Sequence, residues 1–265
     1  MLAAPWTAAM IAIFAWWFFT GAILLIVRKS DKGAAVAHGR SVFLTIPLMA
    51  LGFAGLMVSG EATVANIYIA FLSVLLIWGW IELAFLAGVV TGPEKRACPP
   101  GLSGTDRFVR AFQTLAYHEY LLLLALLAIV AITAGTENTV GLWTYVILFT
   151  ARISAKLNLF FGVPRINTEF VPQPLQHLKS YFRQGNISAA FPVGVTFLSI
   201  TAACFAERLI AAETSAQMVG FALLTAMAAL AALEHWLMVI PLPDAKLWRW
   251  MLPAPNTTKG KPHEL

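Results

Sequence analysis

The residues of this chain that could do chemistry are eight polar side chains set inside long apolar stretches. They are Glu82, His118, Glu119, Arg152, Lys156, Asn158, Glu234 and His235. Ionisable side chains in membrane-spanning segments are costly, and they usually face the interior of a bundle or mark a functional site. Four of these residues, one from each of four stretches, lie roughly 9 to 13 Å from the same end of their helices. We therefore predict one buried polar layer as the candidate functional centre.

The simplest chemistry open to this layer is charge pairing. Arg152 and Lys156 are four residues apart and share one face of a helix. We expect that face to meet the carboxylates of Glu82, Glu119 and Glu234. Such a network would hold the helices in register at a modest net gain in stability, and it needs no ligand.

Two other kinds of chemistry remain open. Carboxylates and imidazoles on separate helices can ligate non-haem iron, and the candidate ligands are Glu82, His118, Glu119, Glu234 and His235. Against this, neighbours on a helix point about 100° apart, whereas di-iron bundles use Glu-x-x-His. His118 or His235 could also bind the magnesium of bacteriochlorophyll. We expect no bound cofactor, with bacteriochlorophyll or non-haem iron as the alternative.

Movement of protons or solutes through the layer is disfavoured, because nothing continues the path toward the opposite end. That end offers few ionisable residues, among them Glu137, Glu207, Arg208 and Glu213. A retinal protein is excluded because it needs a lysine in the middle of the last stretch, and Lys246 lies beyond its end.

Composition identifies the solvent in which these residues act. Of the 265 residues, 59% are hydrophobic and only 12% are charged, whereas a soluble domain is roughly 45–50% apolar and about 25% charged. So little charge cannot cover a surface exposed to water, which excludes a cytosolic globular enzyme. The high hydrophobicity also excludes intrinsic disorder. The net charge of +5 comes from basic residues that border lipid, so we expect no nucleic-acid partner.

Seven apolar stretches are long enough to cross a bilayer as helices, which takes about 20 residues. They are residues 7–27, 42–59, 64–90, 114–134, 139–161, 187–210 and 215–240. Several of the breaks between them are short, which makes neighbouring helices antiparallel. We predict an all-α polytopic membrane protein with one integral-membrane domain, residues 1–265, built as a seven-transmembrane-helix bundle.

Lysine and arginine lie almost entirely on one side of this predicted bundle. All of the 18 basic residues except Arg208 fall in the segments 28–41, 91–113, 162–186 and 241–265 or at the helix ends that lead to them. Because basic residues stay in the cytoplasm, we predict a periplasmic N-terminus and a cytoplasmic C-terminus. We expect short ordered loops at 28–41, 91–113 and 162–186, the last two of which are stiffened by proline and glycine. The tail, with Trp248 and Trp250, is either an interfacial anchor or packed on the loops.

Within the loop at 162–186, the sequence predicts a short amphipathic turn with Leu175, Leu178 and Phe182 on one side. We expect this turn to lie along the membrane surface. The candidates for an interfacial contact are its polar residues Glu169, His177 and Tyr181. We expect His177 to be a solvated interface histidine rather than a ligand.

The run from Arg152 to Phe182 has the most distinctive order of residues in the chain. It contains Lys156, Asn158, the helix end Gly162-Val163-Pro164 and Ser180-Tyr181-Phe182. With the Thr91-Gly92-Pro93 turn, this run resembles the PuhE family of photosynthetic complex assembly proteins of purple bacteria, and the resemblance covers nearly the whole chain. It implies a multi-pass protein of the bacterial cytoplasmic (inner) membrane.

The resemblance also implies a role and partners. The role is to aid assembly of the photosynthetic reaction centre with its core antenna, or to modulate bacteriochlorophyll supply. The partners would be photosynthetic membrane-protein subunits or pigment-synthesis enzymes in the lipid bilayer. No catalytic residues are transferred from the family. We expect an assembly factor rather than an enzyme, and the alternative is a membrane metalloenzyme or pigment-binding protein that uses the Glu and His residues of the polar layer.

Overall fold

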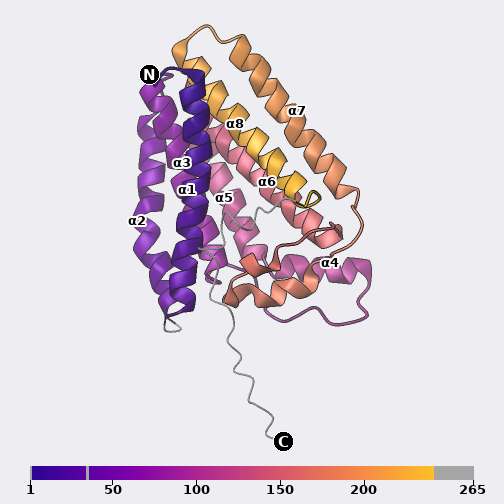
Figure 1. Cartoon of the computed structure of the whole chain (residues 1–265). Coiled ribbons are helices and arrows are strands. Elements are labelled where there is room, and N and C mark those ends of the chain that lie inside the picture. The colour runs from indigo at the N-terminus through magenta and orange to yellow at the C-terminus, as the bar shows by residue number, and fades with distance from the viewer. Residues whose placement is uncertain (1, 34–35, 242–265) are drawn as a thin grey trace, which may run out of the picture.

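Seven long apolar helices make up most of the protein. The computed structural model describes residues 2–33 and 36–241, and seven helices within them are long and apolar enough to cross a membrane. They are α1 (Pro5–Asp31), α2 (Ala37–Val58), α3 (Val64–Leu86), α5 (Ala116–Thr133), α6 (Val140–Phe161), α7 (Ala190–Ile210) and α8 (Ser215–Leu237). Figure 1 shows them packed in one bundle. The described residues contain no strand, so the prediction of an all-α protein with seven apolar spans is confirmed.

Several helix ends are set by residues that the local sequence provides. The Thr63 hydroxyl accepts a backbone N–H at the start of α3, and Thr214 and Gln217 form a capping box at the start of α8. Both satisfy N–H groups that the first turn of a helix leaves without a partner. The last helical residue of α6 is followed by Gly162, whose φ of +134° favours glycine. The predicted boundaries agree with the structure at these three ends.

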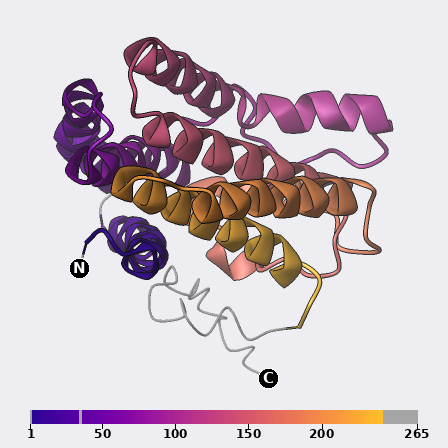
Figure 2. The same ribbon diagram turned by 90° about the horizontal axis from the view of Figure 1, so that it is seen from above.

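Helices α3 and α8 form the centre of the bundle. In the most apolar 18-residue stretch of each helix, 67% of the residues of α3 and 61% of those of α8 are buried, against 17–33% for the other five long helices. Phe71 of α3 and Leu223 of α8 are fully buried in the largest hydrophobic cluster. Outer helices approach through small residues, as at Gly55 of α2, where a Cβ would lie 2.1 Å from Ser73 Oγ of α3. Figures 1 and 2 both show α7 lying beside α8.

The connections at one end of the bundle form a structured layer, which we call the loop layer and define as residues 87–115 and 162–189. It contains α4 (Gly104–Gln113) and two 3₁₀ helices, η1 (Thr168–Phe170) and η2 (Gln173–Tyr181). Figure 1 shows α4 lying across the direction of the long helices. The sequence predicted ordered turns here but not α4. A search for long apolar stretches passes over a helix that is short and amphipathic.

The first loop is shorter than predicted. Helix α1 continues to Asp31 and α2 begins at Ala37, so most of the segment 28–41 is helical. A helix need not end where its apolar residues end, and the first helix-breaking residue after α1 is Gly33. The predicted tail, including Trp248 and Trp250, lies outside the described residues except for its first residue, Pro241.

Candidate functional site

Two ion pairs join α6 to its neighbours inside the bundle. Arg152 Nη2 lies 2.7 Å from Glu82 Oε2 of α3, and the Lys156 ammonium pairs with the Glu119 carboxylate of α5. Because Arg152 and Lys156 lie one turn apart, each base reaches a different helix from the same face of α6. The Glu82 side chain is only 9% exposed, so its carboxylate depends on this partner. We call Glu82, Glu119, Arg152 and Lys156 the charge cluster.

Phe85 and His118 cover one side of the charge cluster. The fully buried His118 ring stacks on Phe85, with ring centroids 4.3 Å apart. The Arg152 and Lys156 cations lie 5.8 and 5.6 Å from the centre of the Phe85 ring, within the range of cation–π attraction. His118 Nε2 is 3.6 Å from Glu82 Oε1, which is too long for a hydrogen bond. Within the described residues neither His118 nitrogen has a hydrogen-bond partner, so packing holds this imidazole in place.

We expected Glu234 to meet Arg152 and Lys156, but its carboxylate has a different partner. Its Oε1 atom accepts a hydrogen bond of 2.9 Å from Trp16 Nε1 of α1, and the residue is exposed at the surface of the bundle. The next residue, His235, is buried. Neighbours on a helix point about 100° apart, so the rotation that turns His235 inward turns Glu234 outward. Trp16 is a partner that our sequence analysis did not identify.

His235 and Asn158 belong to a second polar group, between α6 and α8. His235 Nδ1 lies 2.8 Å from the Ala231 carbonyl oxygen and Nε2 lies 2.9 Å from Ser154 Oγ. Because a carbonyl only accepts, Nδ1 donates, and in the neutral ring Nε2 then accepts the Ser154 hydroxyl. Asn158 is fully buried and donates to the Ser154 carbonyl at 2.9 Å. A Cβ on Gly194 of α7 would lie 2.1 Å from Ser154 Oγ, so α7 closes over this serine.

These contacts separate the candidate metal ligands from one another. Among residues 2–33 and 36–241, no three His, Cys, Asp or Glu side chains come together as a metal ion would require. Glu119, Glu234 and His235 each bond a different partner, and only Glu82 and His118 approach each other. The donors in the described part of the chain therefore do not fit a non-haem iron centre.

Glu94 is the acidic centre of the loop layer, and our sequence analysis missed it. Its carboxylate lies 3.0 Å from Arg96 Nε and 2.7 Å from Arg110 Nη2 of α4. Hydrogen bonds from Arg96, followed by the charge of Arg110, lower the pKa of Glu94 to about 2. The available signal was a single acidic residue directly after Thr91-Gly92-Pro93 among basic residues.

The Thr91-Gly92-Pro93 turn connects the loop layer to the charge cluster. The Thr91 carbonyl accepts the backbone N–H of His118 at 3.0 Å, which satisfies one of the free N–H groups at the start of α5. Gly92 packs against the end of α4, where a Cβ would lie 2.0 Å from the Gln113 carbonyl oxygen. The close approach of two backbones gives a physical reason for glycine in this turn.

The apolar side of the turn that we expected at the membrane surface packs on the end of α3. Leu175 and Leu178 of η2 are buried against Phe85 of α3. Tyr181 is also buried, and its hydroxyl donates to the Arg96 carbonyl at 3.2 Å. The apolar side of this turn therefore contacts protein, and its place along the membrane surface stays a prediction. The apolar side of η2 covers the end of α3, directly beneath the charge cluster.

The other two candidates of this loop differ in exposure. Glu169 of η1 is exposed. His177 of η2 is partly buried, and its Nε2 atom has no hydrogen-bond partner in the part of the chain that the structure describes. Loss of contact with water lowers the pKa of His177, so the ring is neutral at pH 7. The ring of His177 is therefore only partly in contact with solvent, and its place at an interface stays a prediction.

Replacing Glu94 with glutamine is expected to open the loop layer to trypsin. Glutamine removes the negative charge that holds Arg96 and Arg110, so cleavage after the basic residues of segment 91–113 should become several-fold faster. Limited proteolysis in mild detergent, followed by mass spectrometry, measures the rate. Glu61→Gln, at an exposed residue of the opposite end, is the control, and equal rates for the two variants would contradict the role of Glu94.

The same carboxylate predicts how the loop layer responds to acid. Because the pKa of Glu94 is lowered from 4.5 to about 2, its stabilising contribution is complete above about pH 4.5 and is lost as the pH falls through about 2. Wild-type protein should therefore keep its protection of segment 91–113 from pepsin at pH 4 and lose it toward pH 2. Glu94→Gln should show no such step, and a step of equal size in the variant would contradict this assignment.

The chain matches one known protein family and is similar to one known bacterial protein. Residues 2–259 match the family described as protein of unknown function, DUF3623. The chain belongs to the DUF3623 family. It is also 49% identical over 262 residues to a Rhodobacter capsulatus protein described as an uncharacterized 30.4 kDa protein in the puhA 5′ region, a match that covers 97% of this chain and 96% of the relative. No solved structure matches the chain.

Proposed function

We propose that this protein is an integral-membrane assembly factor for the bacterial photosynthetic reaction centre and its core antenna, or for the supply of bacteriochlorophyll to them. The observation that carries the proposal is the gene position of the Rhodobacter capsulatus relative, which is described as lying in the puhA 5′ region. The 49% identity extends over nearly the full length of both chains. This context agrees with the family resemblance noted in the sequence.

The geometry supports a scaffold protein more readily than an enzyme with an active site for small molecules. The charged groups between α3, α5 and α6 bind one another, and Ser154 is closed over by α7. The loop layer is tied to the charge cluster through the Thr91 carbonyl and through η2 packed on Phe85. A rigid layer of this kind offers a surface on which nascent membrane subunits or a pigment-synthesis enzyme can dock.

In this proposal the protein lies in the bacterial cytoplasmic membrane with the loop layer in the cytoplasm and the N-terminus in the periplasm. The support is the distribution of basic residues, because Arg208 is the only lysine or arginine among the described residues that lies at the end opposite the loop layer. Fusions to the C-terminus should make green fluorescent protein fluoresce and leave alkaline phosphatase inactive. An insertion at 211–214 should give the reverse. Active phosphatase at the C-terminus would overturn the orientation.

Deletion of the gene in a purple bacterium that carries it tests the function. We expect lower near-infrared absorption of the assembled core complex. If the protein acts in assembly, extractable bacteriochlorophyll should remain near the wild-type amount, and if it acts in pigment supply, both should fall. Complementation with the wild-type gene should restore the complex. Normal complex in the deletion strain would contradict both forms of the proposal.

A further inference from the structure

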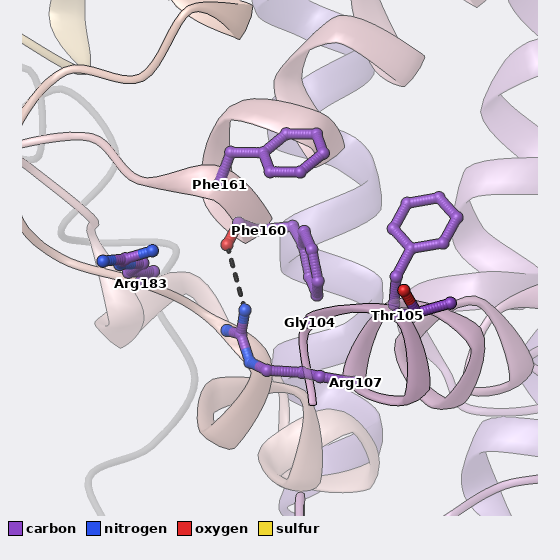
Figure 3. A pocket seen from close by; sticks show the side chains of 7 residues that line it. Gly104, Thr105, Arg107, Phe160, Phe161 and Arg183 are labelled. Carbon is purple, nitrogen blue, oxygen red and sulfur yellow. Dashed lines mark hydrogen bonds between the residues drawn. The ribbon is translucent and has the colours of Figure 1, made fainter. Parts of the chain in front are cut away.

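An open pocket of about 460 Å³ lies in the loop layer, between the first turn of α4 and the last turn of α6. Figure 3 shows it from close by. The residues that line it are Gly104, Thr105, Arg107, Phe108, Phe160, Phe161 and Arg183. Two arginines and three phenylalanines thus share one pocket, and its lining contains no acidic residue.

Arg107 is held firmly at the base of this pocket. Its Nη2 atom donates to the Tyr181 carbonyl at 2.5 Å and its Nη1 atom to the Phe160 carbonyl at 3.4 Å. Its guanidinium carbon lies 4.3 Å from the centre of the Phe160 ring, and Figure 3 shows the side chain running beside this ring. Carbonyl and ring contacts orient the guanidinium but do not neutralise its charge.

Arg183 is positioned by its backbone. Its N–H donates to the Leu159 carbonyl at 2.9 Å, and its carbonyl accepts the N–H of Val163 at 3.2 Å. Its side chain passes Gly162, where a Cβ would lie 3.7 Å from Arg183 Cδ. In the described part of the chain neither Arg107 nor Arg183 pairs with a carboxylate, whereas Arg96 and Arg110 both pair with Glu94.

The apolar side of the pocket lies where a membrane span ends. Phe161 is the last residue of α6, one of the seven apolar spans, and it is 45% exposed. Phe108 of α4 is 43% exposed, and its ring is stacked against Phe161 with centroids 6.5 Å apart. A span that crosses the hydrocarbon ends in the headgroup region, so at this depth exposed rings can contact acyl chains and arginines can contact headgroups.

We propose that this pocket binds an anionic phospholipid. The phosphate lies between Arg107 and Arg183, and the first part of an acyl chain runs over Phe108 and Phe161. Basic pockets at the cytoplasmic ends of membrane helices suit such headgroups, because both the charge and the depth match. The bound lipid anchors α4 to the bilayer. The inference rests on the membrane placement of α6 and is independent of the proposed assembly function.

Lipid retention by the purified full-length protein tests this site. The protein in mild detergent is incubated with equal amounts of phosphatidylglycerol and phosphatidylcholine, and bound lipid is counted by native mass spectrometry. We expect wild-type protein to retain phosphatidylglycerol in preference. Arg183→Gln should lower this preference about fivefold, the effect of one basic residue beside an anionic headgroup. Arg208→Gln, at an exposed arginine of the opposite end, should leave it unchanged.

Two further arms distinguish a lipid from free phosphate and from a general charge effect. Phe161→Ser should weaken lipid retention although both arginines remain, and an excess of inorganic phosphate should not displace the lipid. Circular dichroism and gel filtration check that the variants are folded. Equal retention of the two lipids by wild-type protein, an equal loss in Arg208→Gln, or complete displacement by inorganic phosphate would each overturn the proposal.

Discussion

Replacing Arg152 with methionine is expected to lower the free energy of unfolding by about 3 kcal/mol, the lower end of the range for a broken buried pair, because the Glu82 carboxylate is buried while the Arg152 side chain is 32% exposed. Glu82 is only 9% exposed and has Arg152 at 2.7 Å, while His118 is too distant to replace that bond. Denaturation in mild detergent, followed by circular dichroism, measures the loss. Arg208→Met is the control. Its side chain is 70% exposed and pairs at 3.7 Å with Glu207, so about 1 kcal/mol or less is expected.

The double variant Glu82→Met/Arg152→Met separates the ion pair from the cost of an orphaned charge. Removing both partners takes away the buried charge as well as its counter-charge, so the double variant should recover at least half of the stability lost in Arg152→Met. If the losses of stability in the single variants Glu82→Met and Arg152→Met simply add in the double variant, the two side chains are not coupled and the assignment of this ion pair is wrong.

The same double variant tests whether the charge cluster has a role beyond stability. Expressed in the deletion strain, a folded double variant that restores the core complex would show that the Glu82–Arg152 pair serves structure alone. A folded variant that fails to restore it would show that the charges themselves act in the function.

Replacing Gly92 with alanine is expected to have the second largest effect. The added Cβ would lie 2.0 Å from the Gln113 carbonyl oxygen, and a backbone atom cannot move aside as a flexible side chain can. Overpacking of this kind costs about 1–3 kcal/mol. We expect α4 to separate from the Thr91-Gly92-Pro93 turn, with faster trypsin cleavage between α3 and α5 and a lower midpoint of thermal unfolding.

The matched control is Gly104→Ala, at the start of α4. A Cβ at Gly104 meets no atom within 4 Å, and alanine favours a helix over glycine by roughly 0.5–1 kcal/mol. This variant should therefore be as stable as wild type or slightly more stable. Equal behaviour of the two alanine variants would mean that the close approach at Gly92 does not hold the loop layer together.

Sequence was sufficient for the seven long helices and for part of the charge cluster. A chain segment in lipid must satisfy its own backbone hydrogen bonds, so each long apolar stretch has the helix as its accessible form. The spacing of Arg152 and Lys156 is equally local, because residues four apart share a face in any α-helix. Their partners Glu82 and Glu119 were among the expected carboxylates, since few others lie inside the spans.

Only the tertiary structure decided which face of each helix points into the bundle. Helix α8 has apolar residues on every side, so its sequence does not say that His235 faces inward toward Ser154 and Glu234 outward toward Trp16. The rotation depends on contacts between helices, as at Gly220, where a Cβ would lie 2.8 Å from Val140 Cγ2. The loop layer depends in the same way on approaches between residues distant in the chain, such as Glu94 to Arg110. Hydropathy and residue spacing show which residues share a face of one helix. The contacts between helices depend on the shapes of both partners, and the sequence of one helix does not contain that information.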